Sequence, residues 1–139
     1  MDKQFNEWKL IEILYHEDVK ILKNKGLQEY YSFANTLLKE FLNPELSCYE
    51  SAQCHALSSG EKGYVGHDRV NKDCKMDFYG ECCQYGYSKG LDIVLDLLFD
   101  YDVPSVGHRK ICMSKDYQFI GASTKPHTVY QFNTVIDFK

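Results

Sequence analysis

Six cysteines are the residues whose type and number most directly suggest chemistry in this sequence: Cys48, Cys54, Cys74, Cys82, Cys83 and Cys112. Their even number permits three disulfides, and so many cysteines in 139 residues favour an oxidising compartment. No pair has the Cys-x-x-Cys spacing of a structural zinc site, and the adjacent Cys82 and Cys83 are poorly placed to ligate one metal together. We therefore expect disulfides rather than a thiolate zinc site.

The N-terminal part of the chain has helical periodicity. Apolar residues recur at helical offsets over residues 8–22 and again over residues 27–41, which predicts two amphipathic helices. Asn43 and Pro44 are typical of an N-cap followed by the first residue of a helix. This third helix is expected to carry one set of residues on one side: Leu46, Tyr49, Gln53 and Ala56.

The middle of the chain has no sustained period from Ser58 to Gly90, which predicts a long loop with at most short strands. Loops of this length usually carry function or are held by crosslinks. Ser88 could cap a helix that ends before Pro104, and Gly107 is expected in a further turn. The apolar residues of that helix are Leu91, Val94, Leu95 and Leu98.

The C-terminal residues 129–138 alternate with a period of two, which predicts a long β-strand. Residues 118–123 supply a partner strand, and residues 124–127 are expected to connect the two as a hairpin. Helices followed by strands, with one helix between, favour an α+β fold in which helices cover an antiparallel sheet.

The composition limits the function classes. Hydrophobic residues make up 44% of the chain and aromatic residues 14%, which excludes a disordered polyampholyte. The net charge is −4 and the basic residues are scattered, so we expect no nucleic-acid partner. The longest apolar runs fall far short of the roughly 20 residues that cross a bilayer, so we expect no transmembrane segment. The first six residues lack the apolar stretch of a secretory signal.

Several motifs in the second half of the chain resemble those of one family. The segment Gly107-His108-Arg109, followed by Ile120-Gly121-Ala122 and a terminal strand, resembles the Gly-His-Arg signature of bacterial and protist CAP domains, the SCP-like extracellular domains. Gly80-Glu81-Cys82 resembles the family's Gly-Glu-Asn segment, and residues 52–67 resemble its helix that leads to the first site histidine. The resemblance covers residues 46–138.

The resemblance implies a fold and a set of site residues. The fold is a three-layer α-β-α sandwich, organised as one domain over residues 1–139, with a helical part at 1–43 and a family-matching part at 44–139. The family's cleft holds two histidines and two acids. These transfer here to His67, Glu81, His108 and either Asp102 or Asp100.

Two departures from the family pattern involve cysteine. Cys82 stands where the family has Asn after its Glu, and the Asn that usually follows Gly-His-Arg is replaced near Ile111 and Cys112. Our hypothesis is that a disulfide among Cys82, Cys83 and Cys112 replaces amide hydrogen bonds in these loops.

The implied cleft could hold a divalent cation such as zinc, because imidazole nitrogen and carboxylate oxygen both suit it. His67 and His108 would be the metal ligands, with one position left for water. Without metal the same groups would pair as imidazolium and carboxylate, which raises the pKa of the histidine and lowers that of the acid. The cleft would then respond to mild acid.

Each candidate also has a structural interpretation. Glu81 could instead accept backbone hydrogen bonds, and Asp100 and Asp102 could be solvated turn residues. Arg109 is expected in a structural ion pair, and the tyrosines could line a groove or pack in the core. These tyrosines are Tyr79, Tyr85 and Tyr87. His127 could face the cleft from a turn, whereas His16 and His55 are expected on helix surfaces or in packing.

The expected function is a secreted or surface-exposed binding module without turnover, although a cytoplasmic location stays open. Its partner would be a lipid, another small apolar ligand or an extracellular protein. The alternative is a metal-dependent hydrolase in which Glu81 acts as base, since the sequence has no Gly-x-Ser-x-Gly elbow and no marked thiolate nucleophile. A third interpretation is an interaction domain with a vestigial cleft.

Overall fold

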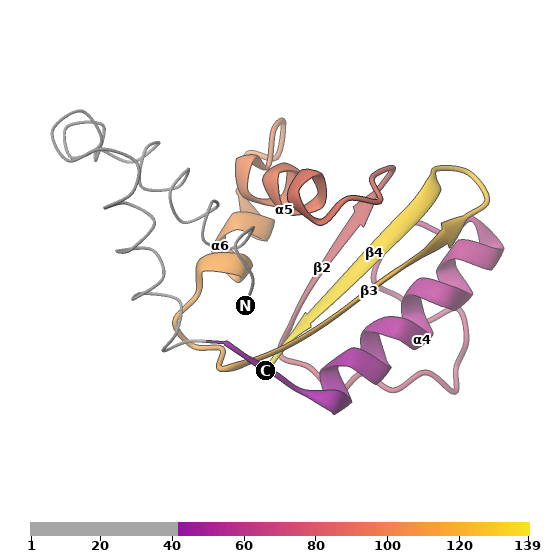
Figure 1. Ribbon diagram of the computed structural model, residues 1–139, viewed down its shortest axis with the longest axis horizontal. Coiled ribbons are helices and arrows are strands. Elements are labelled where there is room, and N and C mark those ends of the chain that lie inside the picture. The colour runs from indigo at the N-terminus through magenta and orange to yellow at the C-terminus, as the bar shows by residue number, and fades with distance from the viewer. Residues whose placement is uncertain (1–41) are drawn as a thin grey trace, which may run out of the picture. The chain divides into compact units, whose positions relative to one another are not determined.

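Four strands form one sheet in the computed structural model, which describes residues 42–139 (Figure 1). They are β1 (Asn43–Pro44), β2 (Gly80–Tyr85), β3 (Phe119–His127) and β4 (Gln131–Phe138), in the order β1-β3-β4-β2. The β3–β4 and β4–β2 pairs are antiparallel, whereas β1 pairs with β3 in parallel. The sheet is therefore antiparallel in its main part and has one short parallel edge.

Helices cover both faces of this sheet (Figure 1). Helix α4 (Leu46–Lys62) packs on one face, and α5 (Gly90–Phe99) and α6 (Gly107–Met113) pack on the other. Along β2, Glu81 and Cys83 face the α4 side, whereas Cys82 contacts α6 and Gln84 donates a hydrogen bond to Asp96 of α5. The predicted α+β class, with helices flanking a sheet in three layers, is confirmed for the described residues.

Small residues bring α4 close to the sheet. Its buried side chains are Cys48, Ser51, Ala52, His55, Ala56 and Ser59, together with Gly60. A Cβ on Gly60 would collide with the carbonyl oxygen of Pro126 in β3, and a Cβ on Gly121 of β3 would collide with the α4 backbone at Tyr49. Of the residues expected on one side of this helix, Ala56 is buried, whereas Leu46 is 68% exposed and Tyr49 40% exposed.

The expected start of this helix was wrong. Asn43 and Pro44 form β1 instead of an N-cap and a first helical turn. The backbone N–H of Asn43 donates to Gln118 and that of Glu45 donates to Ile120, which keeps the chain extended along β3 until Leu46. The helix then runs to Lys62 and ends at Gly63, whose φ of 65° is the left-handed conformation that glycine adopts easily.

Other element boundaries differ in ways that have physical reasons. Residues 124–127 belong to β3 rather than to a hairpin connection, and the chain turns between His127 and Gln131. Pro126 is tolerated in this strand because β1 pairs with β3 only at Phe119 and Ile120, so no ladder hydrogen bond is needed from Pro126 on that edge. The turn expected at Gly107 is the start of α6, and α5 begins after Lys89 without a cap from Ser88.

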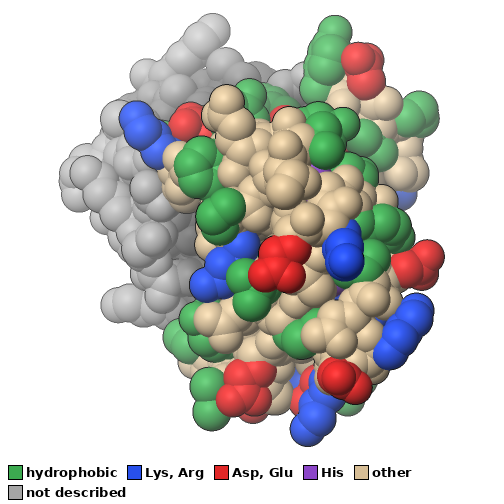
Figure 2. Space-filling model, turned by 90° about the vertical axis from the view of Figure 1, so that its right-hand side faces the viewer, with side chains coloured by type: hydrophobic (Ala, Val, Ile, Leu, Met, Phe, Trp, Pro, Cys, Tyr) green, Lys and Arg blue, Asp and Glu red, His purple; other side chains and the backbone are tan. Residues whose placement is uncertain are grey.

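Backbone contacts divide the chain into two compact units, and the unit Asn43–Lys139 contains all the elements named above. The helices predicted over residues 8–22 and 27–41, and His16 with them, lie outside the described residues, so the single-domain organisation stays a prediction. Among residues 42–139, no helix is both long enough and apolar enough to cross a membrane. On the face seen in Figure 2, acidic, basic and apolar side chains are interspersed.

Candidate functional site

A histidine–carboxylate pair lies where the loop after α4 meets β2. His67 Nδ1 is 2.8 Å from Glu81 Oε1, and the His67 side chain is 55% exposed while that of Glu81 is buried. The hydrogen bond to Glu81 raises the pKa of His67 despite partial burial. Because Nδ1 faces the carboxylate, Nε2 is the ring nitrogen that this arrangement leaves for a ligand.

Arg69 holds Glu81 from the other side. Its Nη1 and Nη2 atoms lie 3.1 Å and 2.7 Å from the two carboxylate oxygens, and the Arg69 side chain is only 4% exposed. Burial alone would raise the pKa of Glu81, but the hydrogen bonds from His67 and Arg69 lower it to about 2. Glu81 is therefore ionised at neutral pH and already saturated with donors.

A second buried acid lies opposite Glu81 across the β2–β4 ladder. Asp137 is fully buried, and its Oδ2 is 3.7 Å from Arg69 Nη2. Within residues 42–139, neither Asp137 carboxylate oxygen has a hydrogen-bond partner. Burial and the neighbouring Glu81 carboxylate raise the pKa of Asp137 to about 8, so this acid is mostly protonated at neutral pH.

A second histidine–carboxylate pair lies at the start of α6. Asp100 accepts two hydrogen bonds from His108, one from the backbone N–H at 2.9 Å and one from Nδ1 at 2.8 Å. The His108 side chain is 31% exposed and that of Asp100 is 3% exposed. Again Nδ1 faces a buried carboxylate, which leaves Nε2 for a ligand.

The connection that positions His108 contains unusual backbone. Asp100, Asp102 and Val106 all have positive φ, of 48°, 60° and 45°. Left-handed backbone is unfavourable for a β-branched residue, so Val106 is held there by its surroundings. Arg109 supports the same corner by donating to the carbonyl oxygens of Leu98 and Phe99 at the end of α5, and the ion pair expected for it stays a prediction.

The four predicted cleft residues thus form two pairs. The structure brings His67 to Glu81 and His108 to Asp100, and it places Asp102 on the exposed connection instead. The pairs are linked through adjacent residues of β2, since Cys83 Sγ is 3.7 Å from His67 Nδ1 and Cys82 Sγ is 3.8 Å from the His108 carbonyl oxygen. In the described part of the chain, no group of three metal-capable donors within 4.8 Å includes His108.

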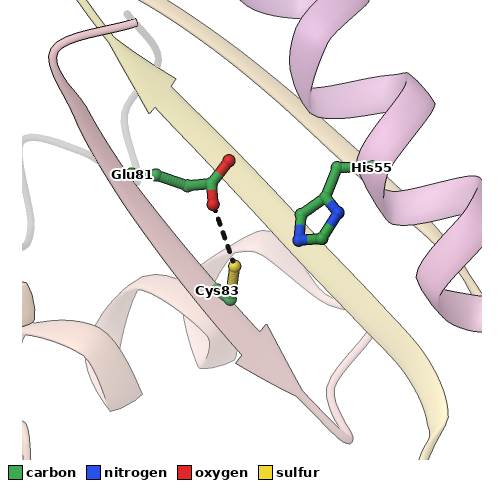
Figure 3. Close-up of side chains that lie close together, drawn as sticks. All are labelled: His55, Glu81 and Cys83. Carbon is green, nitrogen blue, oxygen red and sulfur yellow. Dashed lines mark hydrogen bonds between the residues drawn. The ribbon is translucent and has the colours of Figure 1, made fainter. Parts of the chain in front are cut away.

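One group of potential metal donors does come together, and the sequence did not indicate it. Donor atoms of His55, Glu81 and Cys83 all lie within 4.8 Å of one another, with His55 reaching from α4 towards β2 (Figure 3). His55 is fully buried and its ring nitrogens face Gly66 O at 2.9 Å and Ser59 Oγ at 3.1 Å. A metal here would have to displace the Gly66 contact, and it would lie beside the Arg69 cation.

The sequence could not reveal the buried polar layer around these residues. His55, Arg69 and Asp137 lie on three separate segments, and Arg69 and Asp137 would be expected at the surface from their residue types alone. The one available signal was the alternation in the terminal strand, which places Asp137 on a single face with Asn133 and Val135. His127 is buried too, and its Nε2 lies 3.0 Å from Tyr64 O, so it packs rather than facing a cleft.

The tyrosines expected either in a groove or in the core have different surroundings. Tyr85 packs against His127 and Tyr130, and its hydroxyl accepts a hydrogen bond from the Gly66 N–H. Tyr79 is 76% exposed and Tyr87 47% exposed.

The cysteines divide into one bridge and four thiols. Cys54 on α4 and Cys74 in the following loop form a disulfide, which confirms the general expectation of disulfide bonding. Cys48, Cys82, Cys83 and Cys112 are buried free thiols, so the structure does not contain the disulfide hypothesised among Cys82, Cys83 and Cys112. Burial raises the pKa of Cys83, so it is not an activated nucleophile. Its sulfur and the Glu81 carboxylate also meet the same nitrogen of His67, which is not the arrangement of a nucleophile–base–acid relay.

A separate apolar hollow opens beside the start of α4. Its volume is about 500 Å³. The lining residues come from β1, α4 and β3: Pro44, Glu45, Leu46, Tyr49, Ile120, Gly121 and Ala122.

Comparison with known proteins gives a likeness in fold. No protein-family model and no curated protein sequence matches the chain. Among solved structures, the chain is similar to an outer surface protein from Borrelia burgdorferi, with 19% sequence identity and a TM-score of 0.55. The match covers 94% of this chain and 91% of that protein. At this identity the likeness shows a shared fold.

Proposed function

We propose that this protein is an extracellular binding module of the CAP type that binds a divalent cation such as zinc through Nε2 of His67 and of His108. The observation that carries the proposal is the shared geometry of the two histidines, each with Nδ1 2.8 Å from a buried carboxylate. Histidines that ligate metals characteristically donate their other ring N–H to such a group, which fixes the ring and presents the free nitrogen.

The roles of the two acids follow from this arrangement. Glu81 and Asp100 orient the histidines and supply negative charge, whereas the metal would meet the partly exposed imidazoles. His67 pairs with Glu81 of β2, and His108 at the start of α6 pairs with Asp100 at the end of α5.

An extracellular setting is supported by the Cys54–Cys74 disulfide, since such bridges persist in oxidising compartments. The described fold is also shared with a protein whose name describes an outer surface protein. Both observations favour a module that works outside the reducing cytosol.

Binding is better supported than hydrolysis. A general base must accept a proton near neutral pH, but Arg69 and His67 occupy the Glu81 carboxylate and lower its pKa to about 2. Asp137, whose pKa is raised to about 8, is fully buried and has no route to an attacking water. Neither Glu81 nor Asp137 is therefore a suitable base for the hydrolase alternative.

Zinc titration by calorimetry tests the proposal, with the redox state of the thiols established first. We expect micromolar or tighter binding that weakens in His67→Ala and again in His108→Ala, while Cys83→Ser serves as a thiol control. Unchanged binding in both site variants, or no binding by the wild type, would refute the metal function. Loss of binding in Cys83→Ser alone would move the metal to the buried His55 group.

A small apolar ligand is a second candidate, and the hollow beside α4 is the observation that favours it. Its lining is mostly apolar side chains and backbone. A fluorescent fatty acid should bind the wild type and lose affinity when Ala122→Trp fills the hollow, while Leu57→Trp on the exposed side of α4 should leave binding unchanged. Equal binding by both variants would contradict a ligand at this place.

A further inference from the structure

Two free thiols from different layers of the fold face each other. Cys82 on β2 and Cys112 on α6 are 30 residues apart in sequence, yet their sulfur atoms lie 3.9 Å apart. Cys82 is fully buried and Cys112 is 7% exposed. Both sulfur atoms lie between the sheet and the helices α5 and α6.

The neighbouring thiol Cys83 is directed elsewhere. Because successive strand residues point to opposite faces, Cys83 lies on the α4 side and contacts His67, Gly66 and Glu81 instead. Cys48 is buried on α4, on that same side of the sheet. Cys112 is therefore the free thiol that Cys82 faces. Cys83, one residue away but on the other side of the sheet, is a matched control for substitutions of this thiol pair.

Closing the gap requires a small displacement. A disulfide has an S–S distance of roughly 2 Å, so the two sulfurs must approach by about 2 Å. Helix α6 is short, and it follows a connection in which Asp100, Asp102 and Val106 hold left-handed backbone. A small shift of this helix towards β2, with rotation of the two side chains, brings the sulfurs together.

We infer that Cys82 and Cys112 form a second disulfide that ties α6 to β2 under oxidising conditions. With a small-molecule disulfide such as oxidised glutathione as oxidant, one cysteine thiolate attacks a glutathione sulfur and displaces the first glutathione thiolate. The other cysteine then attacks the cysteine sulfur of the mixed disulfide and displaces the second glutathione thiolate. Two protein thiols are oxidised, one glutathione disulfide is reduced, and the two thiol protons pass to the two glutathione thiolates.

The bridge has a structural consequence for the histidines. Cys112 lies four residues after His108 on α6, hence on the same face of that helix, and Cys82 directly follows Glu81 on β2. The disulfide thus joins the helix that carries His108 to the strand that holds His67 through Glu81. Oxidation fixes the separation of the two histidine–carboxylate pairs, whether or not they bind metal.

Peptide mapping after refolding tests the bridge. The fully reduced protein is refolded in a mixture of oxidised and reduced glutathione, free thiols are alkylated, and a nonreduced digest is analysed by mass spectrometry. We expect two crosslinked peptides, Cys54–Cys74 and Cys82–Cys112, with Cys48 and Cys83 alkylated. Alkylated Cys82 and Cys112 in protein that has regained Cys54–Cys74, or a bridge that involves Cys83, would overturn the inference. If refolding fails, the same criteria apply to the native protein incubated with oxidised glutathione.

Hydrogen exchange tests the tie between α6 and β2 without using metal. Amides of α6 should exchange at least about tenfold more slowly in the oxidised protein than in Cys112→Ser, and the oxidised protein should melt at least about 5 °C higher. In Cys83→Ser, oxidation should still slow the exchange of the α6 amides and raise the melting temperature. The amides of α4 provide an internal reference for the exchange rates. Equal α6 exchange in oxidised wild type and Cys112→Ser would contradict the structural role even if the bridge forms.

Discussion

Arg69 and Glu81 form a two-point ion pair inside the layer between α4 and the sheet, with nitrogen–oxygen distances of 2.7 Å and 3.1 Å. Arg69 comes from the loop that follows α4, and it also reaches Ser51 of that helix and lies over the ring of Phe78. One side chain therefore anchors the loop that carries His67. Because Glu81 also binds His67, the ion pair connects the stability of the fold to the position of His67, the candidate metal-ligating residue.

Removing the cation from this pair should be costly. Arg69→Met leaves Glu81 buried beside Asp137 without its main partner, and loss of one member of a buried pair typically costs about 3–5 kcal/mol. Urea unfolding at pH 7 measures the change, and Lys62→Met at the exposed end of α4 should stay within about 0.5 kcal/mol of wild type. A loss below about 1 kcal/mol for Arg69→Met would show that the pair does not hold the loop.

Asp137 should make the protein less stable as pH rises. The ordinary pKa of its carboxyl is 3.8 and the pKa in the fold is about 8, so the folded state binds the extra proton between these values and stability falls with increasing pH. Asp137→Asn mimics the protonated acid and lacks this loss. Between pH 5 and 8 the wild type should lose about 1 kcal/mol per pH unit relative to the variant.

Urea unfolding of both proteins at pH 5, 6.5 and 8 isolates this effect. Because the pKa of His67 is raised in the fold, both proteins lose some stability as the pH rises above 6.5. The stability that ionised Glu81 contributes is lost only as the pH falls from about 4.5 towards 2. The difference between the two curves therefore reports Asp137. Parallel curves would mean that Asp137 is ionised in the folded protein.

The backbone at Val106 should be relieved by glycine. A left-handed residue with a side chain costs about 1–2 kcal/mol, whereas the added freedom of glycine in the unfolded chain costs about 0.5–1 kcal/mol. Val106→Gly should therefore raise the free energy of unfolding by about 0.5 kcal/mol. Val103→Gly, at a position without positive φ, should lower the free energy of unfolding. A thermal melt that ranks the two variants the other way would contradict the backbone strain at Val106.

The two candidate acids at the α5–α6 connection should behave differently. Asp100→Asn weakens the hold on His108 Nδ1, and loss of such a partner typically reduces metal affinity about 10–100-fold. Asp102→Asn changes an exposed turn residue and should leave the zinc affinity at wild-type strength. Calorimetry on the two variants compares them directly, and equal effects would remove Asp100 from its orienting role.

Periodicity predicted the parts of the fold in which local pattern and tertiary packing agree. The alternation over residues 129–138 identified β4, and the apolar spacing of Leu91, Val94, Leu95 and Leu98 identified α5. Prediction failed where long-range contacts override local preference. Asn43 and Pro44 have the local preference of a helix start, but hydrogen bonds to Gln118 and Ile120 make them part of a sheet.

The site was predictable only in part. The resemblance supplied His67, Glu81 and His108, and it left the second acid open between Asp100 and Asp102. Asp100 is the one that pairs with His108, because a left-handed residue at the end of α5 turns its side chain back to the first turn of α6. Arg69 and Asp137 were missed because burial of charged groups depends on partners from distant segments, which no local pattern contains.

The most direct measurement is a zinc titration followed by nitrogen-15 NMR of the histidine rings. We expect His67 and His108 to carry their proton on Nδ1 before zinc is added, when neutral, and zinc to shift the Nε2 resonance of both. His55, which donates from Nε2 to Gly66, should keep its resonances and serve as the internal reference. Zinc that shifts the His55 nitrogens, or that leaves both His67 and His108 unchanged, would contradict the proposed binding site.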